Sequence, residues 1–575
     1  MQQYRFLFFL FTLALWSCAN QTQPTGGPKD EDPPKLIASD PVQGAINVSA
    51  DEVELTFNEF IKTENPKEQL IISPRVNIEF EIKYRKNKAF ITFEEDLPDS
   101  TTFTFNFREA IVDITESNPP ENLKLAFSSG TYLDSLSISG NVKFHLSDKA
   151  AENATVVLYQ IDDTLDIFTG PPLYFTKTDE KGDYTFDNLK STTYKIYAFQ
   201  DDNKNLIAES KSESYGFRSG TIQLDSSISN IDIPLLHLDV RPLELQSYRQ
   251  SGTTFNIKFN KPLLNYQVLP NSDDQIVSSF SDEEQSNIRI YNTFPIKDSL
   301  QLFITAQDSL NQLTKDTVYL KFEPTQRKTV ELDQRFTLEK VITEERLVKG
   351  SLNFSKPIID VSFDSIYVYI DSTHVYPLDS TNFLWSRDNM SIQYSYLLDK
   401  ELFNKKEDEE SEQRPIPTTI ARDSISTTND STNLTPPKPD LKPHIRFAFA
   451  SFITAEQDSS SNIKTDLAFT ASDQLGLIAL QIETDNPSFI AQLLDNQDNI
   501  IDEQINETQF YFKYVTPGTY RIRILVDKDQ NGAWDSGNIL SDIEPEPVIF
   551  YAQSTGEQTI TIRANFEIAP DTIKF

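Results

Sequence analysis

The sequence predicts an all-β protein built from tandem β-sandwich domains, and three observations lead to this fold class. Nearly every segment alternates apolar and polar residues with a period of two, which is typical of half-buried strands; Val53, Leu55 and Phe57 alternate with polar neighbours in this way. The 40 Phe and 22 Tyr residues favour strands, and no long amphipathic helix with caps is found. A chain of 575 residues is expected to form several such domains.

The first residues have the pattern of an export signal. Arg5 supplies positive charge, and the run from Phe6 to Leu15 is apolar but too short to span a bilayer. Residues 1–17 are therefore expected to be a signal peptide. The sequence Leu15-Trp16-Ser17-Cys18 resembles the lipobox of bacterial lipoproteins, although Trp16 departs from the usual small or aliphatic residue. The alternative is an ordinary secretory peptide that is cut nearby.

The lipobox resemblance implies that Cys18 is acylated and anchors the protein to a membrane, which needs several acyl chains. Cys18 is the only cysteine, so the mature chain is expected to hold no disulfide. Residues 18–32 are polar and predict a flexible tether. Ala19 after the cysteine is consistent with the outer membrane of the cell envelope, and the acidic run at residues 29–32 resembles a surface-export signal. The sequence is compatible with both the periplasmic face and the surface face of the outer membrane.

The charge balance restricts the classes of partner. A formal net charge of −35 argues against nucleic acid and against electrostatic binding to anionic membranes. Such an acidic surface keeps a protein soluble and tolerates divalent cations. Hydrophobic residues make up 38% of the chain, which is enough for real cores.

One strand ending recurs three times in the chain. It reads Phe57-Asn58-Glu59, Phe259-Asn260-Lys261-Pro262 and Phe354-Ser355-Lys356-Pro357, and the proline is expected to end ladder pairing at a sheet edge. A closing strand follows each copy; the apolar positions of these strands are Leu123, Leu125, Phe127, then Val318, Leu320, Phe322, then Ile445, Phe447, Phe449. The repeats predict three Ig-like sandwiches, at residues 33–135, 237–326 and 327–455.

The first of these regions resembles a known domain. The motifs that carry the resemblance are Pro33-Pro34, Asp40-Pro41, Gly44, Val48, Phe57-Asn58-Glu59, Ile72-Ser73-Pro74 and the strand from Thr101 to Phe107. They are similar to the S-layer-type (SbsA-like) Ig domain that begins many Bacteroidota lipoproteins, often after a tether like Pro24 to Asp30. The resemblance implies an Ig-like sandwich on the cell envelope and implies no reaction.

A second type of module occurs twice, at residues 136–236 and 456–575. Its motifs are Gly140-Asn141-Val142, Ala154 to Leu158, Thr178 to Phe186, Tyr194 to Phe199 and, in the later copy, Gly518 to Leu525. They resemble the prealbumin-like, or carboxypeptidase-regulatory-like, domain, in which a D-x-x-G-x-Y-x-F hairpin packs beside the following strand. Residues 403–443 interrupt the third Ig-like domain. They are rich in charged residues, Ser, Thr and Pro, and predict a disordered insertion.

An acidic loop occurs in both prealbumin-like copies. The later loop has oxygen-bearing side chains at positions 1, 3, 5 and 9, which are Asp527, Asp529, Asn531 and Asp535, with Gly532 at position 6. This is the front half of an EF-hand-type calcium loop, without flanking helices and without Glu at position 12. The earlier loop offers Asp201, Asn203, Asn205 and Glu209, with Leu206 in place of the glycine. The sequence predicts weak Ca²⁺ sites, and the alternative is a pair of ordinary polar hairpin turns.

No catalytic motif is found. The four histidines are scattered over different modules, and the chain has no nucleophile elbow, Walker loop or dinucleotide fingerprint. The sequence therefore favours a non-catalytic envelope protein with a structural, adhesive or interaction role, whose partners are the membrane through Cys18 and glycans or other envelope proteins. One alternative is a carbohydrate-binding accessory protein of an uptake system, with Trp385 and Trp534 as the tryptophans that remain after signal removal. A remote alternative is a hydrolase whose site has no recognisable motif.

Overall fold

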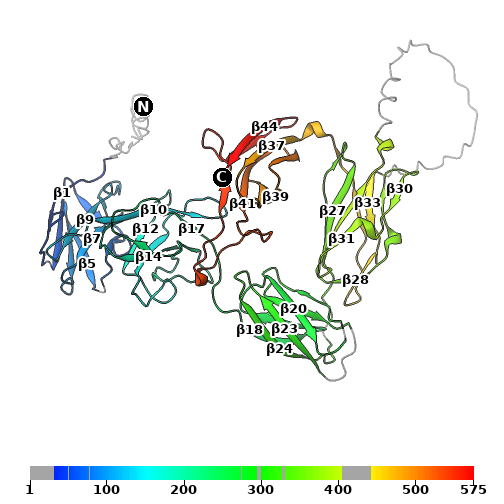
Figure 1. The fold of residues 1–575 in the computed structure, drawn as a ribbon, viewed down its shortest axis with the longest axis horizontal. Helices are drawn as coiled ribbons and strands as arrows, with labels where there is room; N and C mark the ends of the chain where they lie inside the picture. Colours follow the sequence, from blue (N-terminus) through cyan, green and yellow to red (C-terminus); the bar gives the residue numbers. More distant parts are fainter. Residues whose placement is uncertain are drawn as a thin grey trace, which may run out of the picture. The chain divides into compact units, whose positions relative to one another are not determined.

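The computed structural model describes residues 32–49, 51–76, 78–273, 275–293, 299–326, 330–403 and 442–575. These residues form tandem β-sandwiches, so the predicted all-β fold class is confirmed (Figure 1). Helical structure in the described ranges consists of short segments: α2 (Pro66–Gln69), η2 (Phe363–Ser365), η3 (Ser380–Asn382), η4 (Lys400–Leu402), η6 (Ser472–Gln474) and η7 (Ile539–Ser541). None of the described helices is long and apolar enough to cross a membrane.

The chain divides into two compact units, which are described separately. Unit 1 comprises Met1–Lys143, Ala150–Ala208 and Tyr215–Leu235. Unit 2 comprises Phe144–Lys149, Glu209–Ser214 and Leu236–Phe575.

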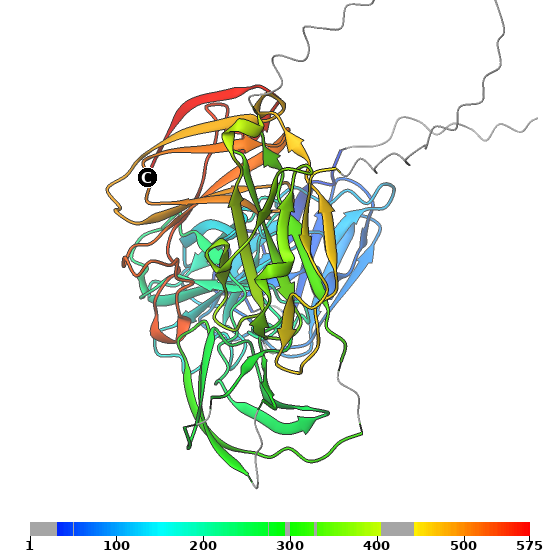
Figure 2. The same ribbon diagram turned by 90° about the vertical axis from the view of Figure 1, so that its right-hand side faces the viewer.

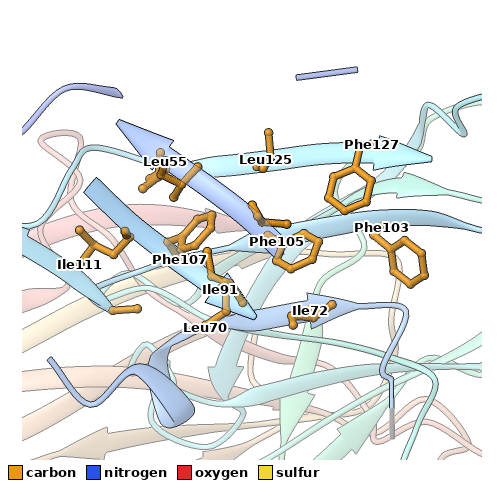
Figure 3. Close-up of a cluster of buried hydrophobic side chains, with 14 of the residues drawn as sticks. Leu55, Leu70, Ile72, Ile91, Phe103, Phe105, Phe107, Ile111, Leu125 and Phe127 are labelled. Carbon is orange, nitrogen blue, oxygen red and sulfur yellow. The ribbon is translucent and has the colours of Figure 1, made fainter. Parts of the chain in front are cut away.

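The first sandwich of unit 1 packs two main sheets over a phenylalanine-rich core. One sheet has the order β1 (Leu36–Asp40), β2 (Glu52–Phe57), β6 (Lys88–Phe93), β5 (Phe80–Arg85), and the other β4 (Ile71–Ser73), β7 (Thr102–Asn106), β9 (Lys124–Ser128); β3 (Ile61–Thr63) pairs with β8 (Ile111–Asp113). Figure 3 shows Phe103, Phe105 and Phe127 in this core, and the rings of Phe105 and Phe127 stack with their centroids 5.4 Å apart. Each buried aromatic side chain contributes about 1.5–3 kcal/mol of transfer free energy.

One strand of the first sandwich is shorter than the alternating pattern in its sequence. The apolar positions from Val76 to Tyr84 suggest a single strand, but β5 begins only at Phe80. Phe80 pairs with Phe93, which is the last residue of β6, so β5 has no partner strand before that point. Val76 and Ile78 nevertheless pack against the core from outside the strand.

The second sandwich of unit 1 also has two sheets. One has the order β13 (Asp183–Leu189), β10 (Leu136–Phe144), β17 (Ile233–Leu235); the other has β12 (Tyr174–Lys177), β11 (Thr155–Gln160), β14 (Thr193–Phe199), β15 (Tyr215–Phe217), with β16 (Ile222–Gln223) on β14. The D-x-x-G-x-Y-x-F segment that forms β13 therefore lies in the sheet opposite β14. Gly182 in its turn has φ +82°, and a Cβ there would lie 2.3 Å from the carbonyl oxygen of Val142, so only glycine fits.

Polar contacts join the two sandwiches of unit 1. The N–H of Arg75 donates to the carbonyl of Leu173 at 2.6 Å, and Lys124 pairs with Asp187 at 2.5 Å. The side-chain nitrogen of Asn188 donates to the carbonyl of Asp134 at 2.8 Å. The side-chain oxygen of Asn188 accepts from the hydroxyl of Thr104 on β7 at 3.2 Å. These contacts make the first two sandwiches one compact body.

Unit 2 continues with two further sandwiches. The first has the sheets β18 (Leu245–Ser251), β19 (Thr254–Phe259), β22 (Asn287–Tyr291), β21 (Ser278–Phe280) and β20 (Asn265–Pro270), β23 (Leu300–Gln307), β24 (Leu313–Leu320). The second has the sheets β25 (Gln334–Leu338), β27 (Leu347–Phe354), β32 (Ser391–Leu397), β31 (Phe383–Trp385) and β30 (Val375–Pro377), β29 (Ile366–Tyr369), β33 (His444–Phe447), β35 (Ile463–Asp466), with the pairs β26 (Val341–Ile342) to β36 (Phe469–Thr470) and β28 (Ile358–Val361) to β34 (Phe452–Thr454). Figure 2 shows the long strands of the second, in green and yellow, running alongside one another.

Two details of the repeated strand ending differ from the prediction. The strands that carry it, β2, β19 and β27, are inner strands of their sheets, not edges. The prolines Pro262 and Pro357 lie three residues beyond the last strand residue, where they remove no ladder hydrogen bond. In the last closing strand, β33 ends at Phe447 and Phe449 is 70% exposed, because the chain turns before Phe449 would enter the sheet.

The last sandwich of unit 2 has the sheets β40 (Gln509–Val515), β37 (Gly476–Glu483), β44 (Glu567–Lys574) and β39 (Ile500–Ile505), β38 (Phe489–Leu494), β41 (Gly518–Val526), β42 (Val548–Phe550), with β43 (Thr559–Ile562) also on β41. In both sandwiches with the second type of motif, a tyrosine hydroxyl donates to the carbonyl four residues earlier: Tyr194 to Lys190 at 2.9 Å and Tyr520 to Thr516 at 2.7 Å. Tyr194 and Tyr520 therefore occupy equivalent positions and make the same local contact in the two copies.

Candidate functional site

The acidic loop at residues 527–535 begins where strand β41 ends. β41 is hydrogen-bonded to β38, β42 and β43, so the loop starts from a fixed base. Asp527 is 1% exposed, and the hydroxyl of Ser488 donates to its Oδ2 at 2.7 Å. The N–H of Asp527 in turn donates to the carbonyl of Ser488 at 3.1 Å. The first residue of the loop is therefore held at both its backbone and its side chain.

The rest of the loop winds around its own side chains. Asp527 accepts hydrogen bonds from the N–H groups of Asn531 and Gly532, at 3.2 and 3.0 Å. Asp529 also accepts from the N–H of Asn531, at 3.1 Å, and Asn531 Oδ1 accepts from Ala533 at 2.8 Å. Gly532 has φ +91°, which a residue with a side chain rarely adopts. This arrangement turns successive acidic side chains toward the inside of the loop.

Glu546 completes the cluster, and the sequence prediction missed it. Single carboxylate oxygens of Asp527, Asp529 and Glu546 all lie within 4.8 Å of one another. Glu546 Oε1 accepts from the N–H of Lys528 at 2.5 Å, and Oε2 accepts from the N–H of Asp535 at 2.9 Å. Glu546 follows Asp527 by nineteen residues and precedes β42, so the spacing of an EF-hand loop could not reveal it.

The other two predicted ligands lie beside this cluster. The Asn531 amide nitrogen donates to Asp529 Oδ2 at 3.2 Å and to Asp535 Oδ2 at 2.7 Å. Asn531 therefore bridges the carboxylates of positions 3 and 9. The indole N–H of Trp534 donates to the carbonyl of Glu546 at 3.0 Å, so this tryptophan fastens the loop to the segment before β42.

The electrostatics of the cluster favour a cation. The hydrogen bond from the Ser488 hydroxyl lowers the pKa of Asp527 most, and the N–H groups of Gly532 and Asn531 lower it further. Burial opposes these effects but does not cancel them, so the carboxylate is ionised. Two unit charges 4 Å apart repel each other by about 4 kcal/mol near a protein surface. A hard divalent cation with oxygen ligands removes this repulsion, and carboxylate, amide and backbone oxygens are the ligands that Ca²⁺ takes. Asp527, Asp529 and Glu546 are the residues that could hold it.

The earlier loop has the same winding in its first half. Asp201 is 8% exposed and accepts from the N–H groups of Asn205 and Leu206, at 3.0 and 3.3 Å. Asn203 Oδ1 accepts from Asn205 at 3.0 Å. Leu206 has φ +62° and thus takes the left-handed conformation that Gly532 has in the later loop, at a cost of about 1–3 kcal/mol.

The last position of the earlier loop, Glu209, begins a segment of unit 2. There the N–H of Glu209 donates to Glu213 Oε2 at 2.8 Å, and Glu213 is 2% exposed. This repeats the later loop, in which Asp535 donates to Glu546. Within the described ranges, Asp527, Asp529 and Glu546 are the one group of three or more acidic, His or Cys side chains whose ligand atoms lie within 4.8 Å of one another. The earlier loop offers two acidic side chains, Asp201 and Glu209, with the amides of Asn203 and Asn205, and its metal binding stays a prediction.

The tryptophans considered for sugar stacking both contact protein. Trp385 is half-buried at the end of β31, with its ring centroid 6.3 Å from that of Phe452. Trp534 is half-buried in the acidic loop. Residues 1–31, which include the predicted signal peptide, Cys18 and most of the tether, lie outside the described residues, as do residues 404–441 of the predicted insertion.

Comparison with known proteins identifies one domain. Residues 30–129 match the family described as the bacterial Ig-like domain, which confirms that the N-terminal motifs belong to a bacterial Ig-like domain. No curated protein matches the chain. Among solved structures, the chain is similar to the major pilin subunit BcpA of Bacillus cereus, with 11% identity, 77% of this chain and 99% of that chain covered, and a TM-score of 0.12.

Two other solved structures have comparable similarity. For domains 1–6 of the surface layer protein SbsC, the identity is 10%, the TM-score is 0.14, and 64% of this chain and 63% of that chain are covered. For the SGBP-B protein of a Bacteroides ovatus mixed-linkage glucan utilization locus, solved with a heptasaccharide, the identity is 10%, the TM-score is 0.13, and the coverage is 74% and 94%.

Proposed function

We propose that this chain is a non-catalytic lipoprotein of the bacterial cell envelope that acts as a modular structural, adhesive or interaction protein. The observation that carries the proposal is the tandem array of sandwiches with separate hydrophobic cores, which begins with a bacterial Ig-like domain. A series of rigid sandwiches behind a tether holds its outer surfaces away from the point of attachment. The lipobox-like sequence that ends at Cys18 supplies that attachment.

Attachment is tested by exchanging the cysteine. In cells that express the full chain, Cys18→Ser is expected to abolish incorporation of labelled fatty acid and to move the protein from the outer-membrane fraction to the soluble fraction. Ser17→Ala, which keeps a small residue before the cysteine, is the matched control and should stay in the membrane. Equal membrane recovery of the Cys18→Ser protein and the native protein would refute the lipid anchor. Protease treatment of intact cells then distinguishes the surface from the periplasmic face.

Calcium binding is the second part of the proposal. We propose that Asp527, Asp529 and Glu546 bind Ca²⁺ with oxygens of Asn531 and Asp535 nearby, and that the cation stiffens the last sandwich. Support comes from the convergence of three carboxylates on one point from two separated segments. Extracellular sites of this kind bind with dissociation constants of about 10⁻⁴–10⁻³ M.

A groove in unit 1 favours carbohydrate binding as the alternative function. Two adjoining cavities of about 550 and 590 Å³ share Gln69, Arg108, Asn153 and Lys177, which come from the first two sandwiches. Gln69 Oε1 is buried there, with no hydrogen-bond partner among the described residues, so a ligand hydroxyl could donate to it. In glycan-array binding, Asn153→Ala is expected to abolish a signal that Trp385→Ala leaves intact. A native protein that binds no glycan removes this alternative.

A further inference from the structure

Lys356, in the third copy of the repeated strand ending, lies buried between two carboxylates. Its side chain is 2% exposed, and its Nζ lies 2.8 Å from Glu456 Oε2, whose side chain is 9% exposed. Nζ also contacts Asp458 Oδ2 directly. An amine, a carboxylate and a second carboxylate are thus in contact within one sandwich of unit 2.

The backbone holds these three side chains in register. Strand β28, which begins two residues after Lys356, pairs with β34, and the N–H of Ala455 donates to the carbonyl of Pro357 at 2.9 Å. Thr454 is fully buried, and its hydroxyl accepts from the N–H groups of Glu456 and Asp458, at 3.3 and 3.2 Å. The turn that carries both carboxylates is therefore fixed against the residue that follows the lysine.

The preceding sandwich contains a matched site without the second carboxylate. Lys261 occupies the same place in its strand ending and pairs with Asp308 at 2.5 Å, with side chains 2% and 4% exposed. The other acceptors of Lys261 Nζ are the backbone carbonyls of Asp239 and Arg241, at 2.9 and 2.5 Å. The two sites differ in Glu456, a group that can move protons beside the amine.

We propose that Lys356 and Asp458 form an intramolecular isopeptide bond, with Glu456 as the acid–base residue of the reaction. Glu456 accepts a proton from the ammonium, and the Nζ lone pair attacks Cγ of Asp458 to form the N–C bond. Glu456 returns protons to the departing oxygen, and one C–O bond breaks. The overall change converts an ammonium and a carboxylate into an amide and one water molecule, so no oxidant or other co-reactant is needed.

The fold provides what this condensation requires. Groups held in contact react as if at effective concentrations of up to about 10⁵–10⁸ M. Burial alone lowers the pKa of Lys356, but its contacts with Asp458 and Glu456 outweigh this and raise the pKa, so the resting state is an ion pair. The reaction therefore depends on Glu456 to generate the neutral amine. At Lys261, where no second carboxylate contacts the amine, the pair stays ionic.

The bond would close a chain segment that contains residues 404–441, which allows a direct test. A site for a specific protease is inserted in this segment of the full-length protein, and the cleaved protein is run on a denaturing gel under reducing conditions. The expected result is that the two fragments stay joined and run as a single band on the gel. Peptide mapping should recover a branched peptide that joins Lys356 to Asp458, lighter than the two peptides together by the mass of one water molecule.

Variants separate the bond from other causes of linkage. Lys356→Arg and Glu456→Gln should each give two separate fragments after cleavage, while Lys261→Arg should still give the linked product. Thermal unfolding shows whether each variant is folded. Two separate fragments from the folded native protein would overturn the proposal, and so would a water loss that maps to other residues. A branched peptide that persists in Glu456→Gln, or one that joins Lys261 to Asp308, would overturn the role assigned to Glu456.

Discussion

At the scale of single residues, a buried aspartate organises a turn of the first sandwich. Asp113 is 2% exposed and accepts hydrogen bonds from four successive backbone N–H groups, of residues 115–118, at distances between 2.7 and 3.2 Å. Burial raises its pKa, but these four donors outweigh burial and lower the pKa below the ordinary value of 3.8. The carboxylate of Asp113 thus serves as the hydrogen-bond acceptor for four N–H groups of the turn.

We expect Asp113→Asn to destabilise the first sandwich by about 2 kcal/mol, because hydrogen bonds to a charged group each contribute about 1.5–3 kcal/mol and the amide nitrogen cannot accept. Because the folded pKa is lowered, the stabilisation is present above pH 3.8 and is lost as the pH falls through the folded value. Denaturant unfolding as a function of pH measures both effects. Asp96→Asn, an exposed position, is the control; an equal acid-induced loss in Asp113→Asn and the native protein would contradict the prediction.

The buried pair of Lys261 and Asp308 gives a second prediction at this scale. Asp308 also accepts from the N–H groups of Leu310 and Gln312, at 3.0 and 2.8 Å. Lys261→Met leaves the Asp308 charge buried without its counter-ion and is expected to cost about 3–5 kcal/mol. Denaturant unfolding of the double variant Lys261→Met with Asp308→Asn should recover more than half of this loss, because no charge then remains buried. A double variant as unstable as the sum of the two single variants would refute coupling between the two residues.

At the scale of elements, two of the three repeated strand endings carry a buried lysine that pairs with an aspartate of a later turn. Lys261 pairs with Asp308, and Lys356 pairs with Asp458. The first ending has Glu59 in place of the lysine. The sequence around the motifs predicts the strands, since the alternation of apolar and polar residues reflects burial of one face of the sheet. It does not reveal which of many aspartates meets each lysine, because that depends on turns that follow roughly 50 to 100 residues later in the chain.

The acidic loop shows the same limit for a candidate site. Positions 1 and 3 could be found from the sequence because adjacent side chains in one turn converge by local geometry. Glu546 could not be found, because it reaches Asp527 only through the pairing of β41 with β42. The signal that could have indicated it is the pair of glutamates, Glu213 and Glu546, that follow the two equivalent loops and are buried in both copies.

The loop as an element is tested with Ca²⁺ and EDTA. A ligand that binds only the folded state adds RT ln(1 + [L]/Kd), so Ca²⁺ at ten times a millimolar Kd adds about 1.4 kcal/mol and raises the last unfolding transition by several degrees. Glu546→Gln removes one of the three converging charges and is expected to abolish this increase. Differential scanning calorimetry of the full chain makes the comparison.

The control for the calcium prediction lies in the same sandwich. Glu507→Gln changes an exposed carboxylate and should leave the calcium response unchanged. An equal effect of Mg²⁺ and Ca²⁺ would point to general screening of the acidic surface. The absence of any shift with Ca²⁺ would leave the loop as a hairpin turn held by its own hydrogen bonds.

At the scale of the whole molecule, composition predicted the all-β class, and the alternating strands predicted sandwiches. The chain has no disulfide to stabilise its described domains, since its single cysteine lies at position 18, so burial and contacts between sandwiches contribute their stability. The merging of the first two sandwiches into one compact unit was not predictable, because side chains far apart in sequence make the contact. Lys124 and Asp187, for example, lie 63 residues apart.

This merging predicts that the two sandwiches of unit 1 unfold together, and Asn188 allows a clean test. Asn188 has φ +57° and bridges Asp134 and Thr104 through its side chain, so Asn188→Gly keeps the backbone conformation while it removes both bonds. In calorimetry of the full chain, Asn188→Gly should lower or split the unit 1 transition by a few degrees, for a loss of about 1–2 kcal/mol. Asn230→Gly, an exposed position with φ +62°, carries the same backbone entropy change and should lower the temperature of the unit 1 transition by less. If the two variants behave alike, the loss is due to glycine and not to the bridge between the sandwiches.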